Sequence, residues 1–303
     1  MSLTIIGGID MNTNWSYQYK MLAPHVKMIV INVAIFLLFS LVFGLFQIPQ
    51  AYILDWFGMP DSLNGFLTRP WTIITYAFFH GGFRHILFNM ITLYFSGNIF
   101  MNLFSGKRFY TVYLLGAIAG GVLYFLSYNI FPAFTNSIIP QYLIGASAAV
   151  MAILIFVCAY IPNQEVRVFM FNVKLWHVGI FFVLMDLLQI SESNPGGHIA
   201  HLGGALLGFV YARQLGQGND IGAWFSSLMD GIANLFSGKK SEKTKFKKVY
   251  RNKKSTDSSA KVFNNDKNIH QKKIDAILDK ISKSGYESLS KDEKDYLFKA
   301  GKN

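Results

Sequence analysis

Runs of apolar residues, separated by short polar segments, fill most of the chain up to Gly216. A helix needs roughly 20 apolar residues to cross the hydrocarbon core of a bilayer. Six stretches come near that length, at about 28–48, 82–104, 109–131, 146–161, 174–190 and 199–216. This pattern predicts an all-α, polytopic membrane protein built as a six-helix bundle. The fourth stretch is short, so we expect it at the centre of the bundle, where its ends do not meet lipid.

A long segment, at about residues 50–82, separates the first two stretches and carries Trp56 and Trp71 among many aromatic residues. Aromatic side chains gather where a membrane meets water. The pattern fits an interfacial structure in the headgroup layer and an ordinary loop with an aromatic belt equally well.

The distribution of charge predicts how the spans are oriented across the membrane. Charged residues make up 15% of the chain, whereas soluble domains carry about 25%. Basic residues gather in alternate loops, at Lys20, Lys27, Lys107, Arg108, Arg167 and Lys174. Since basic loops face the cytosol, we expect the amino end inside, and six spans return the carboxyl end to the same side.

The residues after Gly216 hold nineteen of the 28 Lys and Arg residues. We therefore divide the chain into a cytosolic amino-terminal segment (1–27), a membrane domain (28–216) and a basic cytosolic tail (217–303). The tail is predicted to contain an amphipathic helix at about 220–236 and a small helical segment at about 270–300. Its charge suits membrane lipid rather than nucleic acid, because no base-reading motif is present. Cys158 is the only cysteine, which excludes a disulfide framework.

Strongly polar residues inside apolar stretches are costly in lipid, so they are functional candidates. His85 and Asn89 lie four residues apart, on one face of the second predicted helix. Ser147 lies in the first turn of the fourth, near Gly145, where free N–H groups and the helix dipole favour an oxyanion. Ordinary explanations remain open, because polar pairs tie helices together and a serine at a helix start often only caps it.

The sixth stretch carries His201 with Gly204 and Gly208 on the same face. Glycines at this spacing let a neighbouring helix approach closely, so the imidazole can be pressed against a partner residue. A packing seam with an incidental histidine also fits the spacing. His198 lies one turn earlier and lacks the glycine pattern, and Asp186 in the fifth stretch is a weaker candidate for orienting a histidine.

Together these motifs resemble the rhomboid family of intramembrane serine proteases. That family has a His and an Asn on its second span, GxS on its fourth and HxxGxxxG on its sixth. The corresponding residues here are His85 and Asn89, Gly145 to Ser147, and His201 to Gly208. The resemblance covers about residues 56–213.

The resemblance implies a rhomboid-like bundle around a water-filled cavity, with Ser147 as nucleophile and His201 as general base and acid. It also implies that Asn89, His85, the Ser147 amide and the Gly145 region stabilise the oxyanion. Neither a cofactor nor a metal ion is required. Expected substrates are other membrane proteins, cut in or near a transmembrane segment that enters past the fifth span, the family's lateral gate. We expect a bacterial-type protein in the inner membrane.

Three departures from the family pattern stand out. Ala148 replaces the usual glycine after the nucleophile, Met151 replaces an aromatic residue, and Thr72 replaces the arginine of a Trp-Arg pair. None removes a reacting group. The alternatives are an inactive relative that binds client helices, a metalloenzyme that uses several histidines, and a transporter, for which we find no internal repeat.

Overall fold

A computed structural model describes residues 15–135, 141–168, 170–192, 194–237 and 261–300. It divides into two compact units, residues 1–240 and 241–303. The helices of the first unit are α1 (Trp15–Met21), α2 (Pro24–Leu45), α3 (Ala51–Phe57), α4 (Leu63–Thr68), α5 (Thr72–Thr75), α6 (Phe83–Leu103), α7 (Gly106–Ile130), α8 (Pro132–Thr135), α9 (Ser147–Tyr160), α10 (Leu175–Gln189), α11 (Pro195–Gly216) and α12 (Ala223–Ser237).

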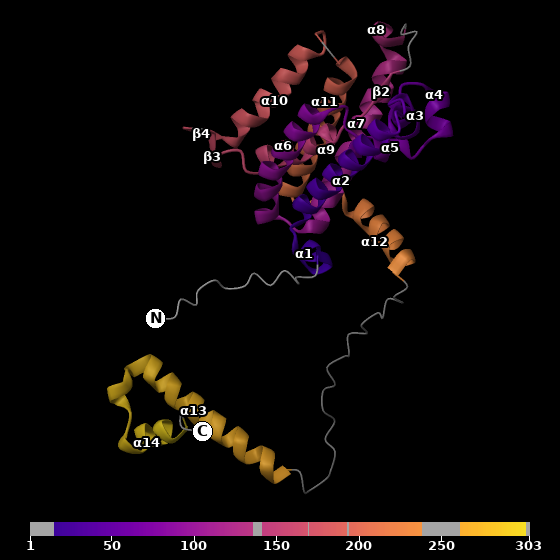
Figure 1. Cartoon of the computed structure of the whole chain (residues 1–303). Coiled ribbons are helices and arrows are strands. Elements are labelled where there is room, and N and C mark those ends of the chain that lie inside the picture. The colour runs from indigo at the N-terminus through magenta and orange to yellow at the C-terminus, as the bar shows by residue number, and fades with distance from the viewer. Residues whose placement is uncertain (1–14, 136–140, 169, 193, 238–260, 301–303) are drawn as a thin grey trace, which may run out of the picture. The chain divides into compact units, whose positions relative to one another are not determined.

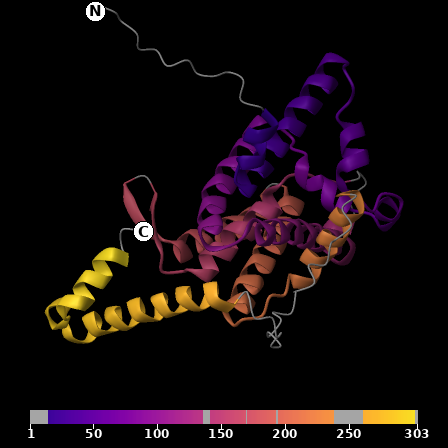
Figure 2. The ribbon, with the colours of Figure 1, turned by 90° about the horizontal axis from the view of Figure 1, so that it is seen from below.

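The six apolar stretches correspond to α2, α6, α7, α9, α10 and α11, which pack in one bundle (Figures 1 and 2). Among the described helices, α2, α6 and α7 are long and apolar enough to cross a membrane by length and composition. The helices α9 and α10 are apolar but shorter, at 14 and 15 residues. The molecule is thus mostly helical, with three long apolar helices and further shorter ones.

Helix α9 is buried among its neighbours. Every side chain from Ala148 to Cys158 is buried, and the helix contacts α6, α7, α10 and α11. A helix of 14 residues is about 21 Å long, which is shorter than the hydrocarbon core. Because protein surrounds it, its ends do not face hydrocarbon.

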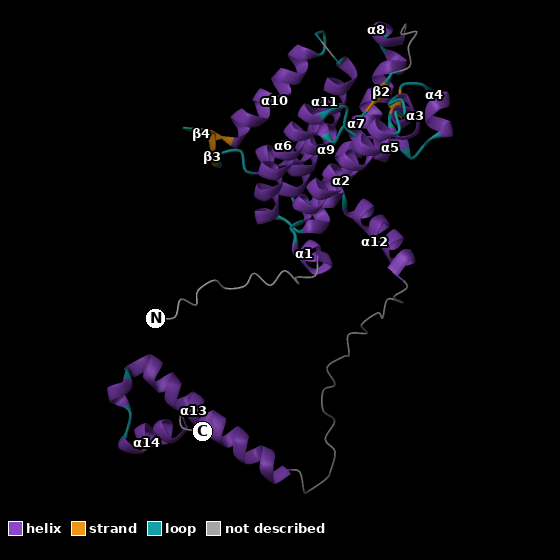
Figure 3. Cartoon of the chain, in the orientation of Figure 1, coloured by secondary structure: helices purple, strands orange, loops and turns teal. Residues whose placement is uncertain are grey.

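Two small antiparallel sheets accompany the helices, so the predicted all-α molecule is mostly rather than entirely helical (Figure 3). Strand β1 (Met59–Pro60) pairs with β2 (Tyr142–Leu143), and β3 (Glu165–Val168) pairs with β4 (Phe171–Lys174). Strands of two to four residues are too short to show the alternation by which a sequence announces a strand. The β1–β2 pair ties the segment at about residues 50–82, called the outer segment because it lies outside the six apolar helices, to the residues just before α9.

The outer segment is an ordered structure built from α3, α4, α5 and the 3₁₀ helix η1 (Tyr76–Phe78). Arg69 forms an ion pair with Asp55, which also accepts a hydrogen bond from the Tyr142 hydroxyl at 2.9 Å. The rings of Trp56 and Trp71 stack, with centroids 6.2 Å apart. These contacts fix the segment where the family's Trp-Arg pair is missing.

Helix α12 begins just after α11 and is attached to the start of α7. Its Asp230 pairs with Lys107, and Asp220 accepts hydrogen bonds from Arg108 and from the Tyr211 hydroxyl. Its apolar face is largely exposed, at Trp224, Leu228, Met229, Ile232 and Leu235. That face suits the lipid surface predicted for this helix.

The second unit consists of α13 (Lys261–Ser284), the 3₁₀ helix η2 (Tyr286–Ser288) and α14 (Lys291–Ala300). A capping box opens α14, since the Glu293 carboxylate accepts from the Ser290 N–H at 2.7 Å and the Ser290 hydroxyl accepts from the Glu293 N–H at 3.3 Å. Lys280 of α13 pairs with the same carboxylate. Residues 238–260, between α12 and α13, lie outside the described residues.

Candidate active site

Helices α9 and α11 touch backbone to backbone through the predicted glycine face. A Cβ atom added to Gly204 would lie 2.0 Å from the carbonyl oxygen of Ala148, and one added to Gly208 would lie 2.3 Å from that of Ala152. The two contacts are four residues apart on both helices, so the helices run in the same direction. This seam, Gly204 and Gly208 against Ala148 and Ala152, fixes how far His201 lies from the start of α9.

Ser147 and His201 open onto one cavity of about 780 Å³. Ser147 is the first residue of α9, and His201 precedes Gly204 by one turn of α11. The side chains of His85 and Asn89, from α6, line the same space. The structure therefore gathers these four sequence-predicted residues around one cavity, which they reach from three different helices.

No hydrogen bond joins the Ser147 hydroxyl to the His201 ring in the described part of the chain. In enzymes without substrate such catalytic bonds are often long and tighten only when substrate binds. Both side chains line the shared cavity, so they can adjust there while the seam holds the two helices in place.

Asp186 connects α10 to the candidate base. Its carboxylate oxygen Oδ1 lies 2.7 Å from Nδ1 of His201 and 2.8 Å from Nδ1 of His198, and the residue is buried. An ionised carboxylate only accepts hydrogen bonds, so both Nδ1 atoms donate. His201 then carries its proton on Nδ1, which leaves Nε2 free to accept one from a serine.

The sequence makes Asp186 only a weak candidate for orienting a histidine, whereas in the structure its carboxylate contacts two histidines. Its one sequence signal is an acid inside an apolar stretch. Twelve and fifteen residues separate it from the two histidines, and that spacing alone does not pair them.

The loop before α9 is held by bonds to the outer segment. The Gly145 N–H donates to the Tyr76 carbonyl at 3.0 Å, and the Ala146 N–H donates to Nε2 of His80 at 3.4 Å. Gly145 has φ +129°, and a Cβ there would lie 2.6 Å from the His85 ring. Only glycine meets both demands, so Gly145 shapes the approach to Ser147 and lets His85 lie against the loop.

Asn89 uses part of its amide within its own helix, donating to the His85 carbonyl at 3.0 Å. The amide carries a second N–H, and Asn89 lines the cavity. Met151 also lines the cavity, at the position of the family's aromatic residue.

The methyl group of Ala148 is accommodated by a glycine on a third helix. A Cβ added to Gly120 of α7 would lie 2.4 Å from the Ala148 Cβ, and one added to Gly116 would lie 2.3 Å from that of Ala152. The alanine after Ser147 therefore does not crowd the site, because α7 has no side chain opposite it.

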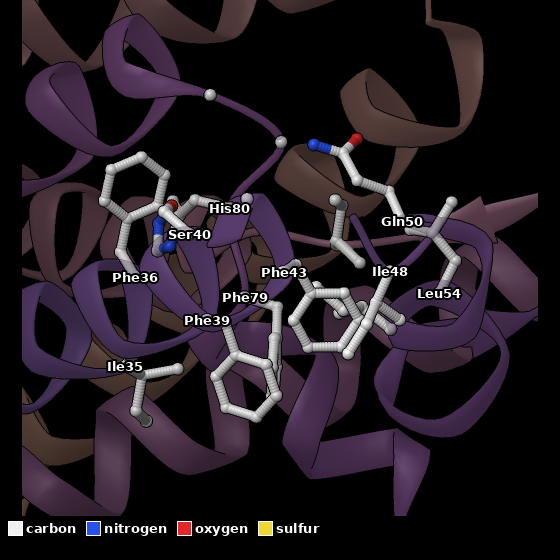
Figure 4. A pocket seen from close by; sticks show the side chains of 15 residues that line it. Ile35, Phe36, Phe39, Ser40, Phe43, Ile48, Gln50, Leu54, Phe79 and His80 are labelled. Carbon is white, nitrogen blue, oxygen red and sulfur yellow. The ribbon is translucent and has the colours of Figure 1, made fainter. Parts of the chain in front are cut away.

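A separate cavity of about 350 Å³ lies between α2 and the outer segment (Figure 4). Phe36, Phe39, Phe43 and Phe79 line it, and His80 is its link to the loop before α9. Neither Ser147 nor His201 reaches it. The four candidate residues Ser147, His201, His85 and Asn89 line the larger cavity instead.

Comparison with known proteins agrees with this geometry. A family model described as the rhomboid domain matches residues 67–218, which is half of the chain. The chain belongs to the rhomboid family. It is accordingly a multi-pass helical membrane protein, since that fold is polytopic. A second model, a family of unknown function (DUF6576), matches residues 259–301.

Among curated proteins, the rhomboid chain is 32% identical over 168 residues to RHOMBOID-like protein 12, mitochondrial, of Arabidopsis thaliana, covering 52% of this chain and 50% of the relative. Presenilin-associated rhomboid-like protein A, mitochondrial, of Danio rerio is 28% identical, covering 51% and 39%. The human presenilin-associated rhomboid-like protein, mitochondrial, is also 28% identical, covering 56% and 44%. The chain spans half or less of the length of these relatives. Their names do not support the bacterial type suggested by the sequence.

Proposed function

We propose that this rhomboid is an intramembrane serine endopeptidase that hydrolyses peptide bonds in or near transmembrane segments of other membrane proteins. Ser147 is the nucleophile, and His201 is the general base and acid. The observation that supports this most directly is the glycine seam, which presses the helix carrying His201 onto the helix that begins at Ser147.

The reaction follows from the proton positions. His201 takes the Ser147 proton on Nε2 while the serine oxygen attacks the substrate carbonyl carbon, and then gives that proton to the departing amine. Water, which reaches the site through the cavity, attacks the acyl-enzyme in the second half of the reaction. No cofactor or metal ion takes part.

Charge on the substrate oxygen is stabilised by donors that already surround Ser147. The Ser147 N–H at the start of α9 is one, and the side chains of His85 and Asn89 are the others. Removing one oxyanion donor from a serine protease typically costs about 3 kcal/mol of transition-state stabilisation. Gly145 contributes by shaping the loop, since its own N–H is bonded to Tyr76.

Asp186 holds His201 in the reactive tautomer. Asp186→Asn keeps the size of the side chain and removes the charge, so we expect kcat to fall by about 10²- to 10⁴-fold, with little change in KM. Glu192→Gln is the matched control, because it removes an exposed acid from the loop after α10. Equal kcat values for the two variants would exclude this role for Asp186.

The proposed topology has six spans, with α9 at their centre and both termini in the cytosol or its equivalent compartment. Basic loops on that side support the sidedness. The relatives carry the word mitochondrial in their names, so the proposed location is the inner membrane of such an organelle or of a cell of equivalent organisation. Substrates are expected to have one span with helix-breaking residues near the outer surface.

The test is cleavage of a tagged single-span reporter by the purified chain in detergent, in the presence of EDTA. The wild type should cut, and Ser147→Ala and His201→Ala should not. Ser227→Ala, which removes a hydroxyl bonded within α12, should cut normally. Reporter that binds the wild type but stays intact would favour the inactive client-binding relative, and cleavage by Ser147→Ala would reject the proposal.

A further inference from the structure

The cluster of Asp186, His198 and His201 has a property that proteolysis does not use. One ligand atom from each residue lies within 4.8 Å of the others. Two imidazoles and one carboxylate form a donor set that suits zinc, with a fourth position left for water. The geometry points to an inhibitory Zn²⁺ site at this cluster, an inference that rests on the proposed function of His201.

The distances fit an ion after a small adjustment. Zinc binds nitrogen and oxygen at about 2.0–2.2 Å, so the ligand atoms of a tetrahedral site lie about 3.3 Å apart. The two Nδ1 atoms lie 2.7 and 2.8 Å from the Asp186 oxygen. The two imidazole ligand atoms lie within 4.8 Å of each other. Opening each hydrogen bond by about half an ångström, and bringing the two imidazole nitrogens to about 3.3 Å, lets the ion replace both hydrogen bonds.

The three side chains are already positioned by packed helices. His198 and His201 lie one turn apart near the start of α11, with ring centroids 5.6 Å apart. Asp186 approaches them from α10. The cavity that Ser147 lines also reaches all three residues. A hydrated ion can therefore enter through the same cavity as the water that hydrolyses the acyl-enzyme.

Bound zinc would stop catalysis by changing the tautomer of the base. A neutral imidazole has one ring proton, and a metal on Nδ1 forces that proton onto Nε2. His201 Nε2 then has no lone pair for the Ser147 proton. The same ion occupies the Asp186 oxygen and links α10 to α11, which also restrains the proposed gate for substrate.

Binding is measured first in a protein that needs no activity. Full-length Ser147→Ala chain, purified without a histidine tag, is titrated with ZnCl₂ by calorimetry in detergent. We expect one ion per chain. Adding His198→Gln should weaken binding by at least about 10-fold, since changes in groups outside the ligand shell already cost that much. Adding His177→Gln, which removes an exposed imidazole of α10, should leave binding unchanged.

Inhibition is measured on chains that retain Ser147, each normalised to its own rate in EDTA. Zinc should inhibit reporter cleavage by the wild type and by His177→Gln at the same concentration. His198→Gln should need at least about 10-fold more zinc for half inhibition. No saturable binding, or equal binding and inhibition with and without His198, would overturn the site.

The two proposals fail differently. A wild type that does not cleave in EDTA rejects the protease, while the calorimetric titration of Ser147→Ala still decides whether zinc binds the cluster. Cleavage that stops in EDTA and returns with ZnCl₂ would overturn inhibition and favour the metalloenzyme alternative. Cleavage in EDTA that His198-dependent zinc binding suppresses supports both proposals.

Discussion

Replacing Gly204 by alanine puts a methyl group into the seam between α9 and α11. The new Cβ would lie 2.0 Å from the Ala148 carbonyl oxygen, whereas ordinary contact begins at 3.4 Å. The neighbour is backbone in a buried helix and has no rotamer to change. The helices must therefore separate by about 1 Å or more at the level of Ser147 and His201, and such a misplacement costs about 10²-fold in rate.

Stability should fall as well. Overpacking a well-filled core costs about 1–3 kcal/mol, partly offset by about 1 kcal/mol from replacing glycine in a helix. Gly216→Ala is the control, because it lies in the same helix and a Cβ there meets nothing within 4 Å. The control shows what an added methyl group does in the same helix without a steric contact.

The assay compares kcat on the single-span reporter and the thermal unfolding midpoint in detergent for both variants. We expect Gly204→Ala to lose about 10²-fold in kcat and to unfold below Gly216→Ala. If Gly204→Ala matched the control in both measurements, the seam would not set the distance between Ser147 and His201.

Two further predictions concern packing and pH. Gly116→Ala should destabilise the chain by about 1–3 kcal/mol, because the new Cβ would lie 2.3 Å from the Ala152 Cβ. Adding Ala152→Gly removes that Cβ and should restore the thermal unfolding midpoint. A midpoint that is not restored would contradict the proposed contact. In the tail, hydrogen bonds from Ser290 and Lys280 hold the pKa of Glu293 below its ordinary value of 4.5. Because the folded pKa is lowered, the ionised carboxylate stabilises the folded unit at pH values above 4.5. This stabilisation is lost as the pH falls through the folded pKa. The protection factors of the amides in residues 286–300, which are exchange rates corrected for the intrinsic rate at each pH, should therefore fall in acid, and Glu293→Gln should remove that pH dependence.

The apolar runs predicted where the helices of the bundle lie, because helices of a membrane bundle are mostly apolar whatever they pack against. Gly204 and Gly208 were also predictable, since helical spacing places them on the face of His201. The sequence could not show that Gly120 makes room for Ala148, because that contact joins two helices through the absence of a side chain. Nor could the sequence show that Asp186 contacts two histidines, because it does not determine how the chain turns between α10 and α11.

The most direct test of the catalytic pair is covalent labelling of the full chain with a fluorophosphonate, which reacts with an activated serine hydroxyl. Mass spectrometry of the digested protein then locates the label. The account predicts labelling at Ser147 in the wild type and none at that residue in His201→Ala. Labelling of another serine in place of Ser147, or equal labelling of Ser147 with and without His201, would contradict it.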